Sequence, residues 1–368
     1  MKFLRRLTKR FFLILHGIVI LLFLTACMAP FVNPARFWPL AFLGLAFPIL
    51  LLLVLFFLFF WLVLAPRYSL LSLGALLVGF RVIGATFAFH LNSSHAPVKP
   101  GSITILSYNV HYFRPYNDTP DQKGRIGREM LGLIRDQHPD IACFPEYFTR
   151  FTRGPGDYED FIRDSIGLKY KYYSSDPIQV WNYVGTTIYS RFPLVGEGRI
   201  PLAGSGENAL FADIADGKDT FRVFAMHLQS IHLTPSDLAG IEQVKRREDS
   251  GFAASRTVLG KIRRAFMKRG EQADRIAEAV SQSPYPVIVC GDFNDTPDSY
   301  TYFRVRGRLQ DAFLEKGFGI GRTYMGISPT LRIDYILADR HFRVNGFSRI
   351  PRALSDHYPI TANLSFSR

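Results

Sequence analysis

The chain has 368 residues and a formal net charge of +13, an excess of basic residues that would ordinarily indicate a nucleic-acid partner. The distribution of the charge argues against that interpretation, because residues 1–100 hold nine Lys and Arg and no Asp or Glu, which leaves 35 basic against all 31 acidic residues in the rest. The nine lie beside long apolar runs, so we attribute them to membrane topology.

Three apolar runs precede residue 90. They cover residues 11–29, 39–65 and 68–89, against the ~20 residues that a membrane-spanning helix needs. Pro30 and Pro34 separate the first run from the second, and Pro66 separates the second from the third. The sequence therefore predicts an all-α transmembrane region over residues 1–91 with about three spans.

The densest basic cluster, residues 2–10, precedes the first run, and the positive-inside rule places it in the cytoplasm. Three crossings then put the remainder outside the cytoplasm, in the periplasm if the protein is bacterial. Residues 24–27 also resemble a bacterial lipoprotein signal, which would remove the first run and leave a lipid on Cys27. Both interpretations put the part of the chain after residue 100 on the same side of the membrane, outside the cytoplasm. Arg81 is costly at mid-bilayer, so it faces other helices or the third run is tilted or partly interfacial.

Residues 92–101 form a polar linker punctuated by proline, and residues 102–368 are enough for one large domain. Helix is predicted over 125–137, and strands over 103–110, 141–144, 185–190, 210–214, 221–227, 287–290, 333–337 and 360–364. Many strands with fewer helices predict a mixed α/β sandwich. Cys143 and Cys290 fall inside predicted strands and are interpreted as core thiols, without a disulfide framework.

A basic amphipathic helix is predicted over residues 255–280. Val258, Phe266 and Ile276 are apolar positions among several Lys and Arg. Such a helix can face anionic lipid or nucleic acid. We favour the simpler interpretation, a surface helix that packs its apolar stripe on the sheet.

Residues 286–295 are the most informative stretch. Four apolar residues form a buried strand, and Gly291 then allows a turn from which Asp292 and Asn294 emerge together. A buried acid is costly unless it has a metal, a proton or a partner. A strand end followed by an ordinary Asx turn is the competing interpretation.

Other apolar strands also end in polar residues, and ligand sites in α/β folds gather at strand ends. Each residue alone has an ordinary explanation, such as a turn former or a buried structural histidine, but their joint occurrence favours one site. The further candidates are Asn109, Glu146, His227, Asp334, Asp356 and His357.

The wording and order of these motifs resemble the endonuclease/exonuclease/phosphatase superfamily, which has the deoxyribonuclease I-like fold. The resemblance spans residues 101–366 and rests on Ser107–Val110, Pro139–Glu146, Gly185–Pro193, Met226–Leu228, Gly291–Asp295, Arg332–Tyr335 and Ser355–Pro359. It implies a four-layer α/β sandwich of two mixed β-sheets flanked by helices, preceded here by the transmembrane region. It also implies hydrolysis of a phosphate ester that depends on Mg²⁺ or Mn²⁺.

Residue by residue, the resemblance assigns roles. Glu146 corresponds to the main metal ligand, supported by Asn109 and Asp356. Asp292 would orient or deprotonate the attacking water, and Asn294 would hold the phosphate or the nucleophile. Two histidines would donate to the phosphoryl oxygens in the transition state: His227, and His357 paired with Asp334.

One position departs from the family pattern, because Pro145 stands before Glu146 where a glutamine is usual. The expected substrate is a nucleic acid or a phospholipid head group, next to the lipid bilayer, and no protein partner is inferred. The alternative is a non-catalytic membrane protein whose soluble domain binds phosphorylated ligands or a partner protein.

Overall fold

The computed structural model describes residues 2–90, 101–113, 123–150, 158–173, 177–179, 182–202, 208–231, 234, 237, 251–326 and 328–367. The chain divides into two compact units. Unit 1 contains residues 1–86, 231–271 and 297–303, and unit 2 contains residues 87–230, 272–296 and 304–368. The predicted linker 92–101, except Gly101, lies outside the described residues.

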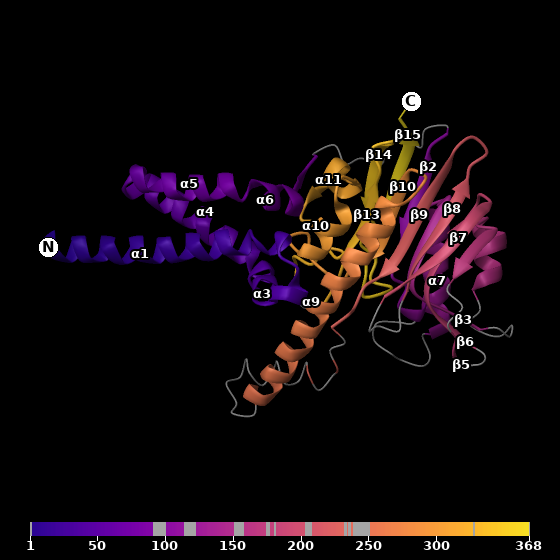
Figure 1. The fold of residues 1–368 in the computed structure, drawn as a ribbon, viewed down its shortest axis with the longest axis horizontal. Coiled ribbons are helices and arrows are strands. Elements are labelled where there is room, and N and C mark those ends of the chain that lie inside the picture. Colours follow the sequence, from indigo (N-terminus) through magenta and orange to yellow (C-terminus); the bar gives the residue numbers. More distant parts are fainter. Residues whose placement is uncertain are drawn as a thin grey trace. The chain divides into compact units, whose positions relative to one another are not determined.

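The N-terminal part of unit 1 is helical. Its elements are α1 (Lys2–Ala26), η1 (Ala29–Phe31), α2 (Pro34–Phe37), α3 (Pro39–Leu45), α4 (Phe47–Leu64), η2 (Pro66–Tyr68), α5 (Ser69–Val78) and α6 (Phe80–Thr86) (Figure 1). Aromatic rings join α1 to α4, as between His16 and Phe57, whose centroids lie 4.8 Å apart. The Nε2 atom of His16 also lies 2.8 Å from the hydroxyl of Ser72 in α5.

In the part of the chain that the structure describes, two helices are long and apolar enough to cross a membrane, Arg6–Phe31 and Phe47–Leu64. The pair Pro66–Val78 and Phe80–Thr86 makes a third span if it is counted as one broken helix, since it bends by 65°. The predicted run 39–65 is divided, because its first residues form α3. Arg81 lies beyond the bend, with its guanidinium 5.6 Å from the centre of the Phe31 ring at the end of the first span.

Unit 2 contains two mixed sheets (Figure 1). The first has the strand order β14-β15-β2-β3-β6-β4, and β5 also pairs with β6. Its strands are β2 (Ile103–Ser107), β3 (Ile141–Arg150), β4 (Tyr170–Tyr173), β5 (Pro177–Gln179), β6 (Asn182–Ser190), β14 (Phe342–Arg349) and β15 (Ile360–Phe366). Only β2 and β3 run parallel among these described pairs.

The second sheet has the order β11-β13-β10-β9-β8-β7. Its strands are β7 (Leu194–Pro201), β8 (Asn208–Ala215), β9 (Thr220–His227), β10 (Val287–Asp292), β11 (Gln310–Asp311) and β13 (Asp334–Ala338). The neighbours β9 and β10 are parallel. A small ribbon pairs β1 (Ala88–Phe89) with β12 (Phe318–Gly319).

The apolar faces of the two sheets share one core. Ile105 and Ile188 from the first sheet meet Val223 and Ile288 from the second, all fully buried. Cys143 and Cys290 lie in this core as free thiols, as predicted. Burial of this apolar surface is the main stabilising contribution to the sandwich.

Helices cover the outer faces. A second core packs α7 (Lys123–Asp136) and the π-helix η5 (Phe161–Ile166) against the first sheet through Met130, Ile134 and Ile162. The other helices are η3 (His111–Phe113), α9 (Gly251–Ser281), α10 (Tyr300–Arg306) and α11 (Ala312–Lys316). The part of α9 in unit 2 attaches beside the second sheet, where the Gln272 side chain accepts from the Gln229 amide at 2.9 Å. The predicted four-layer α/β sandwich is confirmed.

Candidate active site

Three adjacent strands of the second sheet bring acidic and histidine side chains side by side. In the ladder, Asp292 at the end of β10 lies opposite His227 at the end of β9 and opposite Asp334 at the start of β13. Parallel pairing of β9 and β10 and antiparallel pairing of β10 and β13 put all three residues at one edge of the sheet. The polar residues that end these apolar strands in the sequence therefore meet in space.

Gly291 allows this register. Its φ is 134°, a value that L side chains rarely adopt, and a Cβ atom there would overlap the carbonyl oxygen of Met226 on β9. Any side chain would force β10 away from β9. The glycine thus keeps Asp292 level with His227.

Asn109 and Glu146 come from the first sheet. Asn109 follows β2, and Glu146 lies in β3 where the register against β6 shifts between Phe144 and Tyr147. This bulge contains Pro145, which has no N–H to donate to a ladder, and Glu146 has a left-handed φ of 50°. The proline that departs from the family pattern is accommodated in a bulge that re-aims the next side chain.

The segment before β15 supplies Asp356 and His357. The Ser355 hydroxyl donates to the Asn109 carbonyl oxygen at 2.9 Å and lies 3.1 Å from the Asp356 carboxylate. The backbone amide of Met325 donates to the Asp356 carbonyl oxygen at 2.8 Å. These bonds fix the segment against the end of β2.

The Asn109 amide joins the two sheets across the site. Its Nδ2 donates at 3.1 Å to a Glu146 oxygen and at 3.1 Å to Asp292 Oδ2. His227 Nε2 lies 3.6 Å from the same Glu146 oxygen and 3.6 Å from the same Asp292 oxygen. Two carboxylates from different sheets thus face each other with an amide and an imidazole between them.

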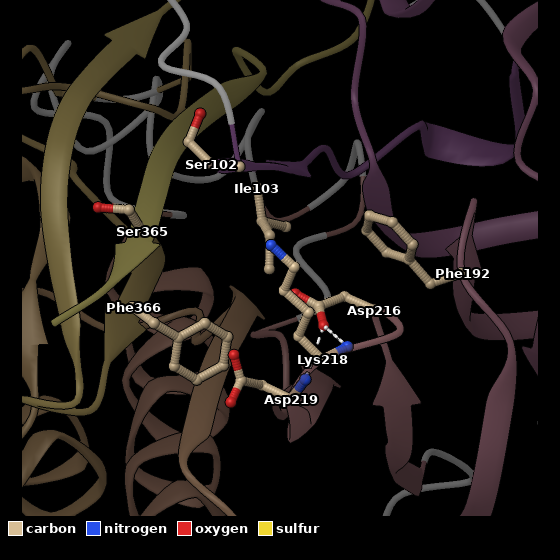
Figure 2. Close-up of a pocket in the computed structure, with 9 residues that line it drawn as sticks. Ser102, Ile103, Phe192, Asp216, Lys218, Asp219, Ser365 and Phe366 are labelled. Carbon is tan, nitrogen blue, oxygen red and sulfur yellow. Dashed lines mark hydrogen bonds between the residues drawn. The ribbon is translucent and has the colours of Figure 1, made fainter. Parts of the chain in front are cut away.

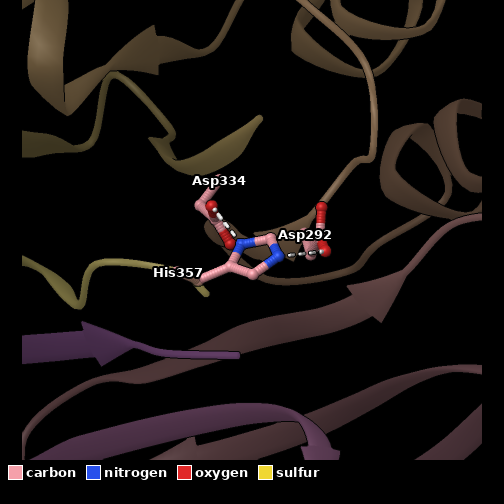
Figure 3. A group of neighbouring side chains, drawn as sticks. All are labelled: Asp292, Asp334 and His357. Carbon is pink, nitrogen blue, oxygen red and sulfur yellow. Dashed lines mark hydrogen bonds and ion pairs between the residues drawn. The ribbon is translucent and has the colours of Figure 1, made fainter. Parts of the chain in front are cut away.

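His357 lies between two carboxylates (Figure 3). Its Nδ1 is 2.8 Å from Asp334 Oδ2, and its Nε2 is 3.6 Å from Asp292 Oδ2. Burial alone would lower the pKa of His357, but the charges of Asp334 and Asp292 outweigh it and raise the pKa to about 10. The imidazole is therefore charged at neutral pH and can donate a hydrogen bond.

The pKa of Asp292 is also raised, but here burial is the main cause and the shift favours the neutral form. Burial raises its pKa to about 6, with a further contribution from Asp334 and opposition from His357. The Asn294 amide nitrogen donates to Asp292 Oδ1 at 2.7 Å, and the Asn294 side chain donates to the Leu228 carbonyl oxygen at 3.0 Å. The Asn294 side chain also donates to Asp292 Oδ2 at 3.3 Å, so Asn294 contacts both Asp292 oxygens, and Oδ2 also faces the two histidines.

Glu146 is held ionised. Burial would raise its pKa, but hydrogen bonding to His111, the charge of His227 and the Asn109 amide lower it to about 2. His111 Nδ1 lies 3.4 Å from Glu146 and 3.8 Å from Asp356. A shared partner therefore brings the Glu146 and Asp356 carboxylates together.

Sequence reasoning missed His111. It begins η3 and does not end an apolar strand, so the strand-end pattern did not select it, although it directly follows Asn109-Val110. It begins three successive non-glycine residues with left-handed φ values of 43°, 59° and 54°. Such backbone costs free energy and clusters at functional sites, which is the signal that identifies it in the structure.

All eight predicted site residues belong to one network. Asn109 links Glu146 to Asp292. Asp292 is also contacted by Asn294 and by His357, and His357 in turn contacts Asp334. His227 contacts both carboxylates, and Asp356 joins through His111. Among the described residues, Asp292, Asp334 and His357 also have ligand atoms within 4.8 Å of one another, close enough to hold a metal ion.

A pocket of about 480 Å³ lies elsewhere (Figure 2). Ser102 and Ile103 line it at the start of β2, Phe366 at the end of β15, and Asp216 and Asp219 in the turn between β8 and β9. These are the opposite strand ends from those that carry Asn109, His357 and His227. The Asp216 carboxylate accepts from the amides of its own turn. The pocket is therefore separate from the network.

Two mixed sheets with Asn, Glu, Asp and His gathered at one end define the class of deoxyribonuclease I-like phosphoesterases. The profile of the Endonuclease/Exonuclease/phosphatase family matches residues 106–357, and the chain belongs to this family. Its members are hydrolases that act on phosphate esters. A second profile, a domain of unknown function, matches residues 9–86.

Solved structures agree on the fold. An endonuclease/exonuclease/phosphatase from Beutenbergia cavernae is 16% identical with a TM-score of 0.50, and the match covers 72% of each chain. A humanized D. rerio TDP2 is 16% identical with a TM-score of 0.50, covering 72% of this chain and 99% of that one. The comparison with curated protein sequences gave no match.

Proposed function

We propose that the protein is a membrane-anchored, divalent-metal-dependent phosphoesterase that hydrolyses a phosphodiester or a phosphomonoester with water. The observation that carries the proposal is the bridge of Asn109 between Glu146 and Asp292. The charged pair of His357 and Asp334 lies directly beside it. This arrangement combines oxygen ligands, a base and a cationic donor at the end of one sandwich.

Glu146, Asn109 and Asp356 are the residues that would hold Mg²⁺ or Mn²⁺. They offer hard oxygen donors, and the pKa of Glu146 near 2 keeps that ligand ionised without a metal. When bound, the ion would neutralise phosphoryl charge and make water a better nucleophile. The Asp292, Asp334 and His357 group fits less well, because Asp334 Oδ2 and His357 Nδ1 are bonded to each other.

Asp292 would accept the proton of the attacking water. With a pKa of about 6 it is mainly ionised at neutral pH yet basic enough to take a proton. Asn294 donates to both of its oxygens, so the base has a fixed orientation. Asn294 would also contact the phosphate or the nucleophile.

His357 and His227 would stabilise the charge that develops on the phosphoryl oxygens. His357 remains protonated because the charges of Asp334 and Asp292 raise its pKa. Its Nδ1–H is bonded to Asp334, which leaves Nε2–H as the donor. His227 Nε2 lies between Glu146 and Asp292, within reach of the same point. Preorganised donors of this kind are worth about 3 kcal/mol each in transition-state stabilisation.

We propose the domain arrangement predicted from the sequence. Residues 1–91 form the transmembrane region, 92–101 the linker and 102–368 the catalytic domain, with the N-terminus in the cytoplasm and the catalytic domain outside it. The two long apolar helices and the absence of acidic residues before residue 101 support it. Lipidation of Cys27, which would remove the first apolar run, is the alternative anchor and puts the catalytic domain on the same side of the membrane.

Hydrolysis of bis-p-nitrophenyl phosphate by the detergent-purified full chain tests the catalytic proposal. We expect turnover that requires Mg²⁺ or Mn²⁺, and Asp292→Ala and His357→Ala variants that lose it at least 100-fold. Asp136→Ala and His341→Ala are the matched controls, because both residues are exposed. The controls should keep wild-type turnover.

The non-catalytic alternative predicts a different result. A protein that only binds phosphorylated ligands or a partner would show no divalent-dependent hydrolysis of any phosphate ester. A panel of DNA, RNA, phospholipids and phosphoinositides separates nucleic-acid from lipid substrates. A reporter fused after residue 100 tests the side, and cytoplasmic reporter activity would overturn the three-span topology.

A further inference from the structure

The first half of α9 carries a basic face within unit 1. Residues 251–270 contain six Lys and Arg and no Asp or Glu. Arg256, Arg263 and Arg264 are exposed, and Leu259 between them is 47% exposed. Arg256, Leu259 and Arg263 follow one another at spacings of three and four residues, which puts them on one side of the helix, and Arg264 adjoins Arg263.

Further along the helix, the same side packs on the helices between the first two spans. The Phe266 ring, 2% exposed, meets Phe42 of α3 edge-on with centroids 5.2 Å apart. The Asn33 side chain, at the start of α2, donates to the Gly270 carbonyl oxygen at 3.4 Å. A Cβ atom at Gly270 would overlap that side chain, so this close approach requires glycine. The predicted apolar stripe thus packs here on α3 instead of the sheet.

The α2–α3 segment lies where a membrane interface is expected. It joins helices Arg6–Phe31 and Phe47–Leu64, and two consecutive spans must be joined at one face of the bilayer. Phe37 is 53% exposed, Arg36 is exposed, and Trp38 lies 5.1 Å beneath the Arg263 guanidinium. Trp and other aromatic residues with Arg are typical of membrane–water interfaces.

Acidic groups do not cancel this charge among the described residues of unit 1. The Asp237 carboxylate is bonded to Lys261 at 2.5 Å. Asp298 is 2% exposed, so it is withdrawn from solvent. Glu271 is exposed, but it lies two turns beyond Arg264. The exposed face is therefore positive and bordered by apolar side chains.

We propose that this face binds the anionic phospholipid head groups of the leaflet at the α1–α4 connection. The interfacial surface consists of Arg36, Phe37, Trp38, Arg256, Arg263 and Arg264. The inference rests on the membrane anchoring of the proposed function. Phospholipid fits better than nucleic acid because Phe37 and Leu259 offer apolar contact beside the arginines, as interfacial amphipathic helices do.

Fluorescence of Trp38 in lipid nanodiscs tests the proposal. The full chain with Trp61→Phe and Trp181→Phe keeps one tryptophan, and brominated phosphatidylglycerol is compared with brominated phosphatidylcholine at equal mole fraction. Quenching is normalised to the same lipid without bromine. We expect quenching by the anionic lipid to exceed that by the neutral lipid at least about twofold, because each arginine near an anionic surface attracts it.

The variant Arg256→Gln, Arg263→Gln, Arg264→Gln should lose this preference while quenching by the neutral lipid persists. The control Arg135→Gln, Arg340→Gln, Arg343→Gln removes three exposed charges from unit 2 and should keep it. Equal quenching by both lipids, or a preference unchanged in the variant, overturns the proposal. The proposal is also overturned if the triple arginine variant loses binding of a DNA oligonucleotide but keeps the preference for the anionic lipid.

Absence of quenching by either lipid would mean that Trp38 is not at a membrane, which refutes the anchoring itself as well as the surface. Hydrolysis of bis-p-nitrophenyl phosphate in the same nanodiscs separates these outcomes from failure of the catalytic proposal. Neutralising the three arginines should leave that hydrolysis unchanged, because none of them belongs to the site network.

Discussion

Replacement of Asp334 by Asn isolates the electrostatic role of the buried histidine. The amide keeps the shape of the side chain and can still accept from His357 Nδ1 across the 2.8 Å contact. It removes the negative charge that contributes most to raising the pKa of His357. Asp292 and Asp356 remain near the ring, and burial continues to lower the pKa.

The size of the effect follows from the pKa. His357 titrates at about 10 in the wild-type protein, so its charged form persists through neutral pH and is lost only as the pH rises through that value. Without Asp334, burial opposes the remaining carboxylates, and we expect a pKa near the ordinary value of ~6.5. Above that pH the charged fraction of the variant falls about tenfold for each pH unit.

The assay is the pH dependence of kcat/KM for bis-p-nitrophenyl phosphate in both proteins. The ratio of wild-type to variant kcat/KM should rise by about 50-fold between about pH 6.5 and about pH 8.5. Asp339→Asn is the control, because Asp339 pairs with the exposed His341 at 2.6 Å and should leave the profile unchanged. Parallel wild-type and Asp334→Asn profiles over this range would refute a charged His357.

Substitutions at Glu146 and Gly291 separate metal binding from folding. Glu146→Gln should raise the Mg²⁺ concentration needed for half-maximal activity at least about tenfold in a metal titration. Glu197→Gln is the control, because Glu197 is exposed, and it should leave that concentration unchanged. Equal titration curves for the two variants would exclude Glu146 as a ligand. Gly291→Ala should lower the free energy of unfolding by about 3 kcal/mol, since the new Cβ overlaps Met226. Gly132→Ala, in an uncrowded helical position, should stabilise by at most about 1 kcal/mol, and similar melting temperatures for both variants would contradict the argument.

Strongly periodic or uniformly apolar segments could be predicted well. The strand predicted at 221–227 became Thr220–His227, and the helix predicted at 125–137 became Lys123–Asp136. Strands β7 and β14 were missed because exposed positions and glycines interrupt their apolar pattern. The run 39–65 looked continuous because hydropathy does not show the break at Ala46 between α3 and α4.

The clustering of the candidate residues was predictable because they end buried strands, and the sheet register brings those ends together. What the sequence could not show is the pairing across the sandwich, such as the Asn109 amide between Glu146 and Asp292. It also could not show that Pro145 lies in a bulge. His111 was not predicted because the feature that identifies it is its left-handed backbone conformation, which the residue type does not reveal.

Metal-dependent turnover is the most direct test of the central claim. The full chain, stripped with EDTA, is assayed with bis-p-nitrophenyl phosphate before and after addition of Mg²⁺ or Mn²⁺, beside Asp292→Ala. The account predicts no turnover in EDTA, recovery with either ion, and turnover in the variant that stays at least about 100-fold below that of the wild-type protein with either ion. Turnover that persists in EDTA, or that Asp292→Ala retains, would contradict it.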